Sequence, residues 1–225
     1  MGDHETPRDG EEKLSEGALE AGRVLFAQSC EFFAGATRAA VLPPPRAPEI
    51  AFAGRSNVGK SSLVNALTGR HTLARISNTP GRTQQINFFD LGGRLTLVDL
   101  PGYGHAQVSK DRVAEWSAVV RLYLKGRPTL RRVLLLIDAR HGPKPVDRSL
   151  MAELDRAAVS YQVVLTKADK LRENEIASAV AAIAAALAKH GAAHPDVLPT
   201  SAETGAGIAE LRAHLARLAT PRTIR

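Results

Sequence analysis

Residues 54–61 read Gly-Arg-Ser-Asn-Val-Gly-Lys-Ser and directly follow a short apolar run. The pattern G-x-x-x-x-G-K-[ST] after a strand is that of a phosphate-binding loop. Gly54 and Gly59 allow successive backbone N–H groups to turn inward, and the helix expected next presents its positive end to the same place. A glycine-rich turn that merely opens a helix would not require Lys60 and Ser61 in succession. The stretch predicts a P-loop domain, with Lys60 near the β- and γ-phosphates of a nucleotide and Ser61 on Mg²⁺.

From Glu49 onward, short apolar runs alternate with amphipathic stretches, which is typical of a strand-helix-strand series in a largely parallel sheet. A Gly92-Gly93 turn indicates a hairpin, so one strand is expected to run antiparallel. We predict an α/β, three-layer P-loop NTPase G domain with a mostly parallel six-stranded sheet and helices on both faces. The expected strands are 49–53, 86–91, 94–99, 131–138, 161–166 and 196–200, and the expected helices lie over 60–68, 113–123, 176–187 and 208–218.

A chain of 225 residues accommodates one domain and a short extension. The G domain is expected over 48–219, with a lead-in element over 22–47 that could pack against its core. Residues 1–21 are expected to form a flexible acidic arm, because so few large apolar side chains cannot offset the entropy of ordering. Residues 220–225 form a basic tail.

The net charge is +7 at pH 7, to which residues 1–20 contribute −5, so the rest of the chain carries +12. A basic body favours a polyanionic partner such as RNA, although a genome's arginine bias produces the same balance. The single cysteine, Cys30, excludes an intramolecular disulfide and a cysteine-based metal cluster. With no signal pattern, membrane span or coiled-coil heptads, a cytoplasmic monomer is expected.

Residues 77–85 are polar and turn-prone, and they lie between the first helix and the second strand of the G domain, where a loop can reach the nucleotide. Thr83 is the predicted second Mg²⁺ ligand, one that binds only when a γ-phosphate is present. Thr79 is the competing candidate, and a plain surface loop is the third possibility.

Asp99 ends an apolar strand and opens Asp-Leu-Pro-Gly, a D-x-x-G segment. It predicts a carboxylate that reaches Mg²⁺ through water and a Gly102 N–H group that contacts the γ-phosphate. Tyr103 stands where many small GTPases carry the glutamine that orients the attacking water, so intrinsic hydrolysis should be slow. A partner, or a monovalent cation such as K⁺ on Asn57, could supply the missing stabilisation. For His105, an exposed loop histidine is favoured over a general base.

Residues 166–169 read Thr-Lys-Ala-Asp, a variant of the guanine-reading N-K-x-D segment. Asp169 can accept hydrogen bonds from guanine N1–H and the 2-amino group, whereas adenine offers neither donor. The Lys167 stem can cover the base, and Thr166 in place of Asn predicts only moderate affinity. Residues 200–202, Thr-Ser-Ala, follow the last strand, where a backbone N–H can contact guanine O6.

Together, GRSNVGKS, TPGRTQQINFF, DLPGYGHA, TKAD and TSAETGAG resemble the EngB (YihA/YsxC) family of bacterial ribosome-biogenesis GTPases, a branch of the Era-like TRAFAC GTPases, over about residues 30–218. The resemblance implies a G domain that hydrolyses GTP with Mg²⁺, assists maturation of the large ribosomal subunit and is linked to cell division and septation. It implies Ser61 and Thr83 as metal ligands. The basic body fits contact with rRNA.

The site that these segments and the family resemblance together imply has two sets of residues. The expected catalytic residues are Asn57, Lys60, Thr83 and Gly102. The expected nucleotide contacts are Gly54, Arg55, Ser56, Asn57, Val58, Gly59, Lys60, Ser61, Gly81, Arg82, Thr83, Gln84, Gln85, Asp99, Leu100, Pro101, Gly102, Thr166, Lys167, Ala168, Asp169, Thr200, Ser201 and Ala202.

Three other functions stay open on the sequence. A signalling or trafficking GTPase would recruit proteins in its GTP state, with hydrolysis as a timer. A phosphotransferase or ATPase could share the phosphate loop, but Asp169 predicts against it. An RNA-binding module with a vestigial nucleotide site is weakened by the presence of Lys60, Ser61, Thr83 and Asp99 together.

Overall fold

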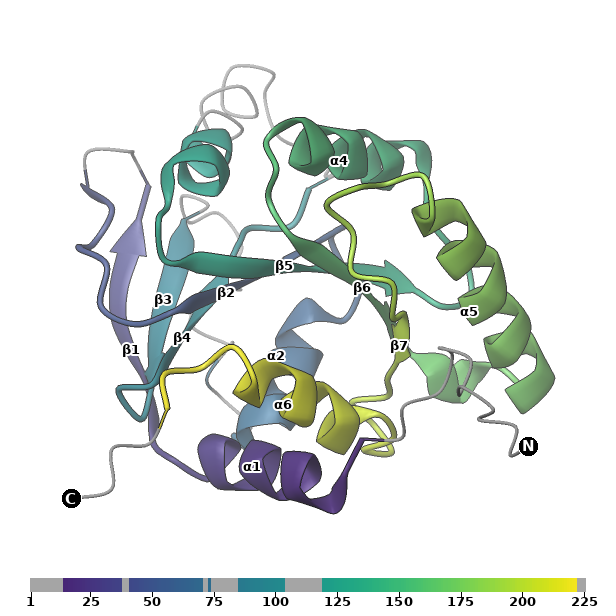
Figure 1. Ribbon diagram of the computed structural model, residues 1–225, viewed down its shortest axis with the longest axis horizontal. Helices are drawn as coiled ribbons and strands as arrows, with labels where there is room; N and C mark the ends of the chain where they lie inside the picture. Colours follow the sequence, from purple (N-terminus) through teal and green to yellow (C-terminus); the bar gives the residue numbers. More distant parts are fainter. Residues whose placement is uncertain (1–13, 38–40, 71–72, 74–84, 104–118, 222–225) are drawn as a thin grey trace, which may run out of the picture.

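Seven strands in the described part of the chain form one mixed sheet (Figure 1). The computed structural model describes residues 14–37, 41–70, 73, 85–103 and 119–221. From one edge to the other, the strands are β1 (Cys30–Ala36), β3 (Ile86–Leu91), β4 (Leu95–Asp99), β2 (Glu49–Gly54), β5 (Leu130–Asp138), β6 (Tyr161–Thr166) and β7 (Leu198–Pro199).

One strand, β3, runs antiparallel to both of its neighbours, and the pairings from β4 to β7 are all parallel. The mostly parallel sheet with one antiparallel strand is therefore confirmed. The expected count of six strands is wrong, because β1 adds an edge strand within the lead-in segment. Its burial does not alternate, since Phe32 is 40% exposed and a bulge interrupts the register between Phe32 and Ala34. A strand without a period of two gives little sequence signal.

Helices cover both faces of the sheet, which confirms the three layers (Figure 1). On β2, Ile50 and Phe52 point into one apolar core, and Ala51 and Ala53 point into the other. The first core is closed by α1 (Glu16–Phe26), α2 (Lys60–Thr68) and α6 (Ile208–Ala216), and the second by α4 (Pro145–Arg156), α5 (Glu173–Leu187) and the helical residues 119–126.

Helix α1 corrects the expected extent of the acidic arm. Ser15 caps the helix by accepting a hydrogen bond from the Ala18 N–H, and Leu25 and Phe26 are buried at its C-terminal end. The helix packs on α6 so closely at Gly22 that a Cβ there would lie 2.6 Å from the Ala213 nitrogen. Residues 14–21 are therefore part of the folded unit, while residues 1–13 lie outside the described residues.

Helix α4 was not predicted from the sequence, because only two of its apolar side chains, Met151 and Leu154, are buried. The sequence at its N-terminus is more typical of a helix start: Pro145 occupies the first turn, and the Asp147 carboxylate accepts a hydrogen bond from the Lys144 N–H. The helix predicted over 113–123 is described only from residue 119 onward, where Tyr123 is buried.

Candidate functional site

The carboxyl ends of five parallel strands meet at one edge of the sheet, and the predicted motifs follow these ends. Strand β2 ends at Gly54, β4 at Asp99, β5 at Asp138 and β6 at Thr166, while Thr200 follows β7. Ligands of open α/β sheets bind outside this edge. The fold thus brings together segments more than a hundred residues apart in the sequence.

The loop after β2 has the backbone of a phosphate cradle that leads into a helix. Gly59 has φ +103°, a conformation that favours glycine, and Asn57 adopts φ +62°. The Gly59 carbonyl then accepts the first helical hydrogen bond, from Leu63 N–H at 2.9 Å. Lys60 begins α2, so its side chain and the helix N-terminus lie at the same end of the loop.

Lys60 and Asp99 form an ion pair across the mouth of this loop. Their side chains are only 11% and 4% exposed, so each charge depends on the other or on a ligand for compensation. Ser61 lies beside Lys60 in the first turn of α2. A serine hydroxyl and a carboxylate are both oxygen donors of the kind that Mg²⁺ requires, and the Lys60 ammonium suits phosphate.

The D-x-x-G segment contacts the phosphate loop directly. Ser56 N–H donates to the Tyr103 carbonyl at 3.0 Å, and Tyr103 N–H donates to the Gly54 carbonyl at 3.2 Å. A Cβ on Gly102 would lie 3.1 Å from Ser56 Oγ, so a larger residue would crowd the loop. Backbone hydrogen bonds thus hold the two segments that would surround a γ-phosphate next to each other.

The Tyr103 side chain turns toward α4. Its hydroxyl donates to Asp147 Oδ1 at 2.7 Å, and burial, followed by the Asp147 charge, raises the pKa of Tyr103 far above its usual range. Because the same carboxylate caps α4, the residue after Gly102 joins the phosphate site to that helix.

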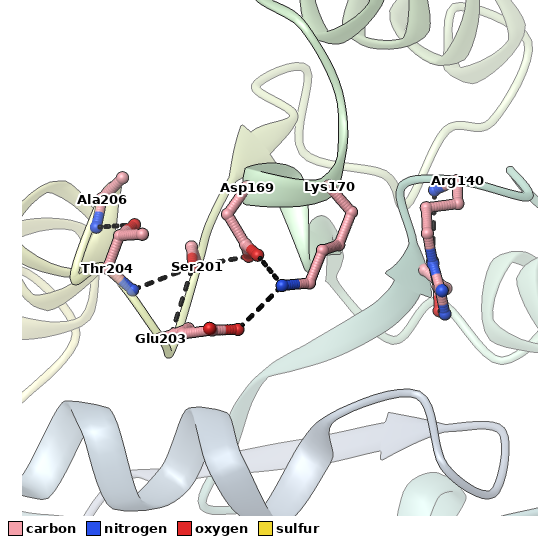
Figure 2. A network of polar contacts seen from close by, with 8 residues as sticks. Arg140, Asp169, Lys170, Ser201, Glu203, Thr204 and Ala206 are labelled. Atoms are coloured by element: carbon pink, nitrogen blue, oxygen red, sulfur yellow. Dashed lines mark hydrogen bonds and ion pairs between the residues drawn. The ribbon is translucent and has the colours of Figure 1, made fainter.

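At the other end of the edge, a pocket of about 270 Å³ lies between α2 and the segments that follow β6 and β7. Within it, Asp169 accepts hydrogen bonds from Ser201 Oγ at 2.6 Å and from Lys170 Nζ at 2.9 Å, and Lys170 also pairs with Glu203 at 3.0 Å (Figure 2). Lys170 and then Ser201 hold the pKa of Asp169 below its ordinary value. The pocket is lined by Gly59, Ser62, Leu63, Thr166, Lys167, Asp169, Lys170, Thr200, Ala202 and Glu203.

Two side chains tie this pocket to the phosphate loop. The Thr166 hydroxyl donates to the Val58 carbonyl at 2.6 Å, and Lys167 Nζ donates to the Asn57 carbonyl at 2.8 Å. Lys167 has φ +58° and also pairs with Asp138 at 3.0 Å. Thr166 therefore supplies a direct contact at the position where an Asn was expected.

Three residues of the site were missed by the sequence reasoning. Asp138 ends β5 as Asp99 ends β4, and this shared position at the edge could have identified it. Arg140 and then Lys167 hold its pKa well below the usual range. Lys170 and Glu203 are exposed charged side chains in turns, a pattern that gives no sequence signal of a site.

Some residues predicted to contact the nucleotide have side chains that point elsewhere in the structure. The Leu100 side chain is buried in the core, and its N–H donates to the Phe52 carbonyl of β2 at 3.1 Å. Gln85 donates to Asn87 Oδ1 and packs against Gly35 of β1. The predicted residues outside the described part of the chain are Thr79, Gly81, Arg82, Thr83, Gln84 and His105.

A cradle that opens a helix, an acid at the end of the neighbouring strand and a carboxylate in a base-sized pocket define a P-loop GTP-binding G domain. Comparison with known proteins specifies the class further. Residues 49–167 match the family described as "50S ribosome-binding GTPase". The chain belongs to the EngB family of GTP-binding proteins, and it shares the family's GTP binding and P-loop GTPase character.

The relatives cover most of the chain. The "Probable GTP-binding protein EngB" of Rhodospirillum rubrum is 59% identical over 96% of this chain and 98% of the relative, and that of Granulibacter bethesdensis is 59% identical over 89% and 90%. A solved structure of a probable GTP-binding protein engB matches with a TM-score of 0.61 and 23% identity over 76% of this chain and 97% of that one, which confirms the fold. None of the described helices is long and apolar enough to span a membrane.

Proposed function

We propose that this protein is a Mg²⁺-dependent, intrinsically slow GTPase that acts in the cytoplasm as a nucleotide-controlled factor in large ribosomal subunit assembly, with a link to cell division and septation. The observation that carries the nucleotide part is the position of Asp169 in the pocket beside the phosphate loop, paired with Ser201. The family description "50S ribosome-binding GTPase" supports the assembly part.

In the proposed nucleotide complex, the backbone N–H groups of residues 54–61 hold the phosphates, and Lys60 exchanges Asp99 for the β- and γ-phosphate oxygens. Ser61 and Thr83 are the proposed Mg²⁺ ligands, and Asp99 holds the ion through water. When bound there, the ion would neutralise the charge that develops on the phosphate oxygens. Gly102 N–H contacts the γ-phosphate, so this segment senses whether GTP or GDP is bound.

Guanine specificity is proposed to come from the Asp169 carboxylate. Its Oδ2 atom is held by Lys170, whose side chain is 47% exposed and can move aside when guanine offers its N1–H and 2-amino donors. Ser201 keeps the other oxygen oriented. Adenine lacks both donors, so it would displace Lys170 from the carboxylate without supplying hydrogen bonds in its place, which costs several kcal/mol (on the order of 10⁴-fold in affinity).

Slow hydrolysis is proposed because Tyr103 replaces the water-orienting glutamine and its hydroxyl is bound to Asp147. Catalysis would then depend on Lys60, Gly102 and Thr83. The missing stabilisation of the transition state would come either from K⁺ bound by Asn57 or from the ribosomal particle. Single-turnover hydrolysis in K⁺ and in Na⁺, each with and without large subunits, separates these two sources.

The ribosomal role is supported by the charge of the chain as well as by the family. A net charge of +7, with an acidic N-terminal segment, leaves a basic body that suits rRNA. The proposal predicts that depleting the protein makes large-subunit precursors accumulate in sucrose gradients, and that wild type but not Lys60→Ala restores mature subunits. Normal subunit profiles after depletion would instead favour a signalling GTPase that recruits proteins.

A further inference from the structure

Three potential metal-binding side chains gather at a place that the nucleotide site does not use. His194 and Asp196 lie on the segment between α5 and β7, and His214 lies on α6. One ligating atom from each residue can be chosen so that all three lie within 4.8 Å of one another. We propose that these residues bind one transition-metal dication of the Zn²⁺ class, with a further coordination position left for water.

The donor set separates this proposal from the Mg²⁺ site. Two imidazoles and one carboxylate suit Zn²⁺, Co²⁺ or Ni²⁺, whereas Mg²⁺ prefers oxygen ligands alone. His194 Nδ1 accepts a hydrogen bond from Asp196 N–H at 3.2 Å and lies 3.7 Å from Asp196 Oδ2, so His194 would bind the metal through Nε2 or in exchange for this bond. The centroids of the His194 and His214 rings are 5.9 Å apart, and the ring planes meet at 80°. Ligands around tetrahedral zinc are roughly 3.4 Å apart, so closing the site requires movements of about 1 Å. Asp196, 55% exposed, has the freedom to make them.

The backbone that carries the first two residues is already fixed to β6. His194 N–H donates to the Tyr161 carbonyl at 2.7 Å, and the Gln162 side-chain amide donates to the Asp196 carbonyl at 3.1 Å. His214 is 8% exposed and sits between the buried Ala213 and Leu215 on α6. Binding therefore needs side-chain adjustment rather than folding of a loop, which reduces its entropic cost.

The local charges favour neutral imidazoles and limit the affinity. Burial lowers the pKa of His194 and of His214, and Arg132 and Arg217 lower both further, while Asp196 opposes the shift. Neutral imidazole is the form that binds a metal, so little proton release is needed near pH 7. The same two guanidinium groups repel a dication, and we therefore expect them to weaken its binding.

A metal here would join α6 to the segment that leads into β7. Thr200, Ser201 and Ala202 of the base pocket lie between β7 and α6 in the chain. The bound ion would thus stabilise the two elements that flank the base pocket without contacting the nucleotide. This inference does not depend on the ribosomal role.

The test uses the full chain, stripped of metal with chelator and saturated with Mg²⁺ and GDP. We expect ZnCl₂ to bind one to one in competition with a chromophoric chelator, CoCl₂ to give visible absorption bands of a low-coordinate site, and the melting temperature to rise with Zn²⁺. His194→Gln and Asp196→Asn, both on the segment between α5 and β7, should each weaken Zn²⁺ binding by at least about 10-fold, the least that losing even a partner of a metal ligand typically costs, while GDP binding is unchanged.

His141→Ala is the matched control, because His141 is an exposed histidine elsewhere on the protein. It should bind Zn²⁺ like wild type. Wild-type affinity in His194→Gln, or equal losses in His141→Ala, would overturn the proposal, as would the absence of saturable one-to-one binding. His214→Ala is a third variant, and it should also bind Zn²⁺ more weakly than wild type. Its GDP affinity is measured as well, because wild-type GDP affinity shows that the variant is folded.

Discussion

The hydroxyl of Thr166 lies 2.6 Å from the carbonyl oxygen of Val58 and donates a hydrogen bond to it. This bond joins the end of β6, beside the proposed base-reading segment, to the loop proposed to hold the phosphates. Lys167 makes a second link to Asn57 in the same loop. The two halves of the nucleotide site are thus held in a fixed relation by the protein itself.

Replacing Thr166 by Val should separate these halves. The variant keeps the side-chain shape but leaves the buried Val58 carbonyl without its donor, which costs about 1–3 kcal/mol. We expect GDP affinity to fall by roughly tenfold, on the same principle, when measured by calorimetry. Thr166→Ser is the control and should stay within a few-fold of wild type. Unchanged affinity in Thr166→Val would show that the link does not organise the site.

Asp169→Asn should alter the choice of base. An amide can donate where guanine also donates, so GTP should bind about 100-fold or more weakly. Xanthine carries an oxygen in place of the 2-amino group and should bind the variant better than it binds wild type. Competition of GTP, XTP and ATP against a fluorescent nucleotide measures all three.

Lys170→Ala is the control for the Asp169 variant, since it removes an exposed ion pair from the same carboxylate. Solvent screens such exposed pairs strongly, so GTP affinity should change by less than about fivefold. A loss as large as that of Asp169→Asn would mean that Lys170, rather than the carboxylate, controls base binding.

Two glycines of α1 provide a matched test of its packing on α6. At Gly22 an added Cβ would meet the backbone of Ala213, so Gly22→Ala should destabilise the protein by about 1–3 kcal/mol. At Gly17 the nearest atom is 4.0 Å away, and Gly17→Ala should be neutral or stabilising by up to about 1 kcal/mol. Urea unfolding measures both. Equal effects would contradict the docking of α1.

Asp138 gives a pH dependence of defined sign. Arg140, then Lys167, lowers its pKa in the folded protein below the ordinary value of 3.8, so its contribution to stability is present above about pH 4 and is lost as the pH falls through the folded-state value. The gap in unfolding free energy between wild type and Asp138→Asn should be constant from pH 5 to 7 and narrow below pH 4. A gap independent of pH would show that the ion pairs contribute nothing.

The positions of the motifs at the ends of the strands were the most predictable part of the protein, because each motif has a local chemical requirement. Gly59 is needed for its positive φ and Asp99 for its place at a strand end, and both follow from residue type and spacing. The core strands were equally clear, since β2, β6 and residues 133–137 of β5 are buried on both faces and are largely apolar.

What the sequence did not predict depends on tertiary contacts. Strand β1 exposes Phe32, and α1 gains its place through the close approach at Gly22, which no periodicity encodes. The role of Thr166 is a further example: the sequence suggested a missing amide contact, whereas the fold brings the Val58 carbonyl within reach of the hydroxyl. The place of Lys170 and Glu203 in the pocket likewise follows only from their ion pairs, Lys170 with Asp169 and Glu203 with Lys170, which the sequence does not show.

The central claim, a nucleotide-controlled factor of the large subunit, is tested most directly by co-sedimentation of the purified protein with separated ribosomal subunits over a salt series. GDP and a non-hydrolysable GTP analogue are compared, and small subunits serve as the control. The account predicts selective binding to large subunits or their precursors that depends on the GTP analogue and persists at physiological salt. Binding that is absent, or is independent of nucleotide and lost at modest salt as expected of a nonspecific polyanion contact, would contradict it.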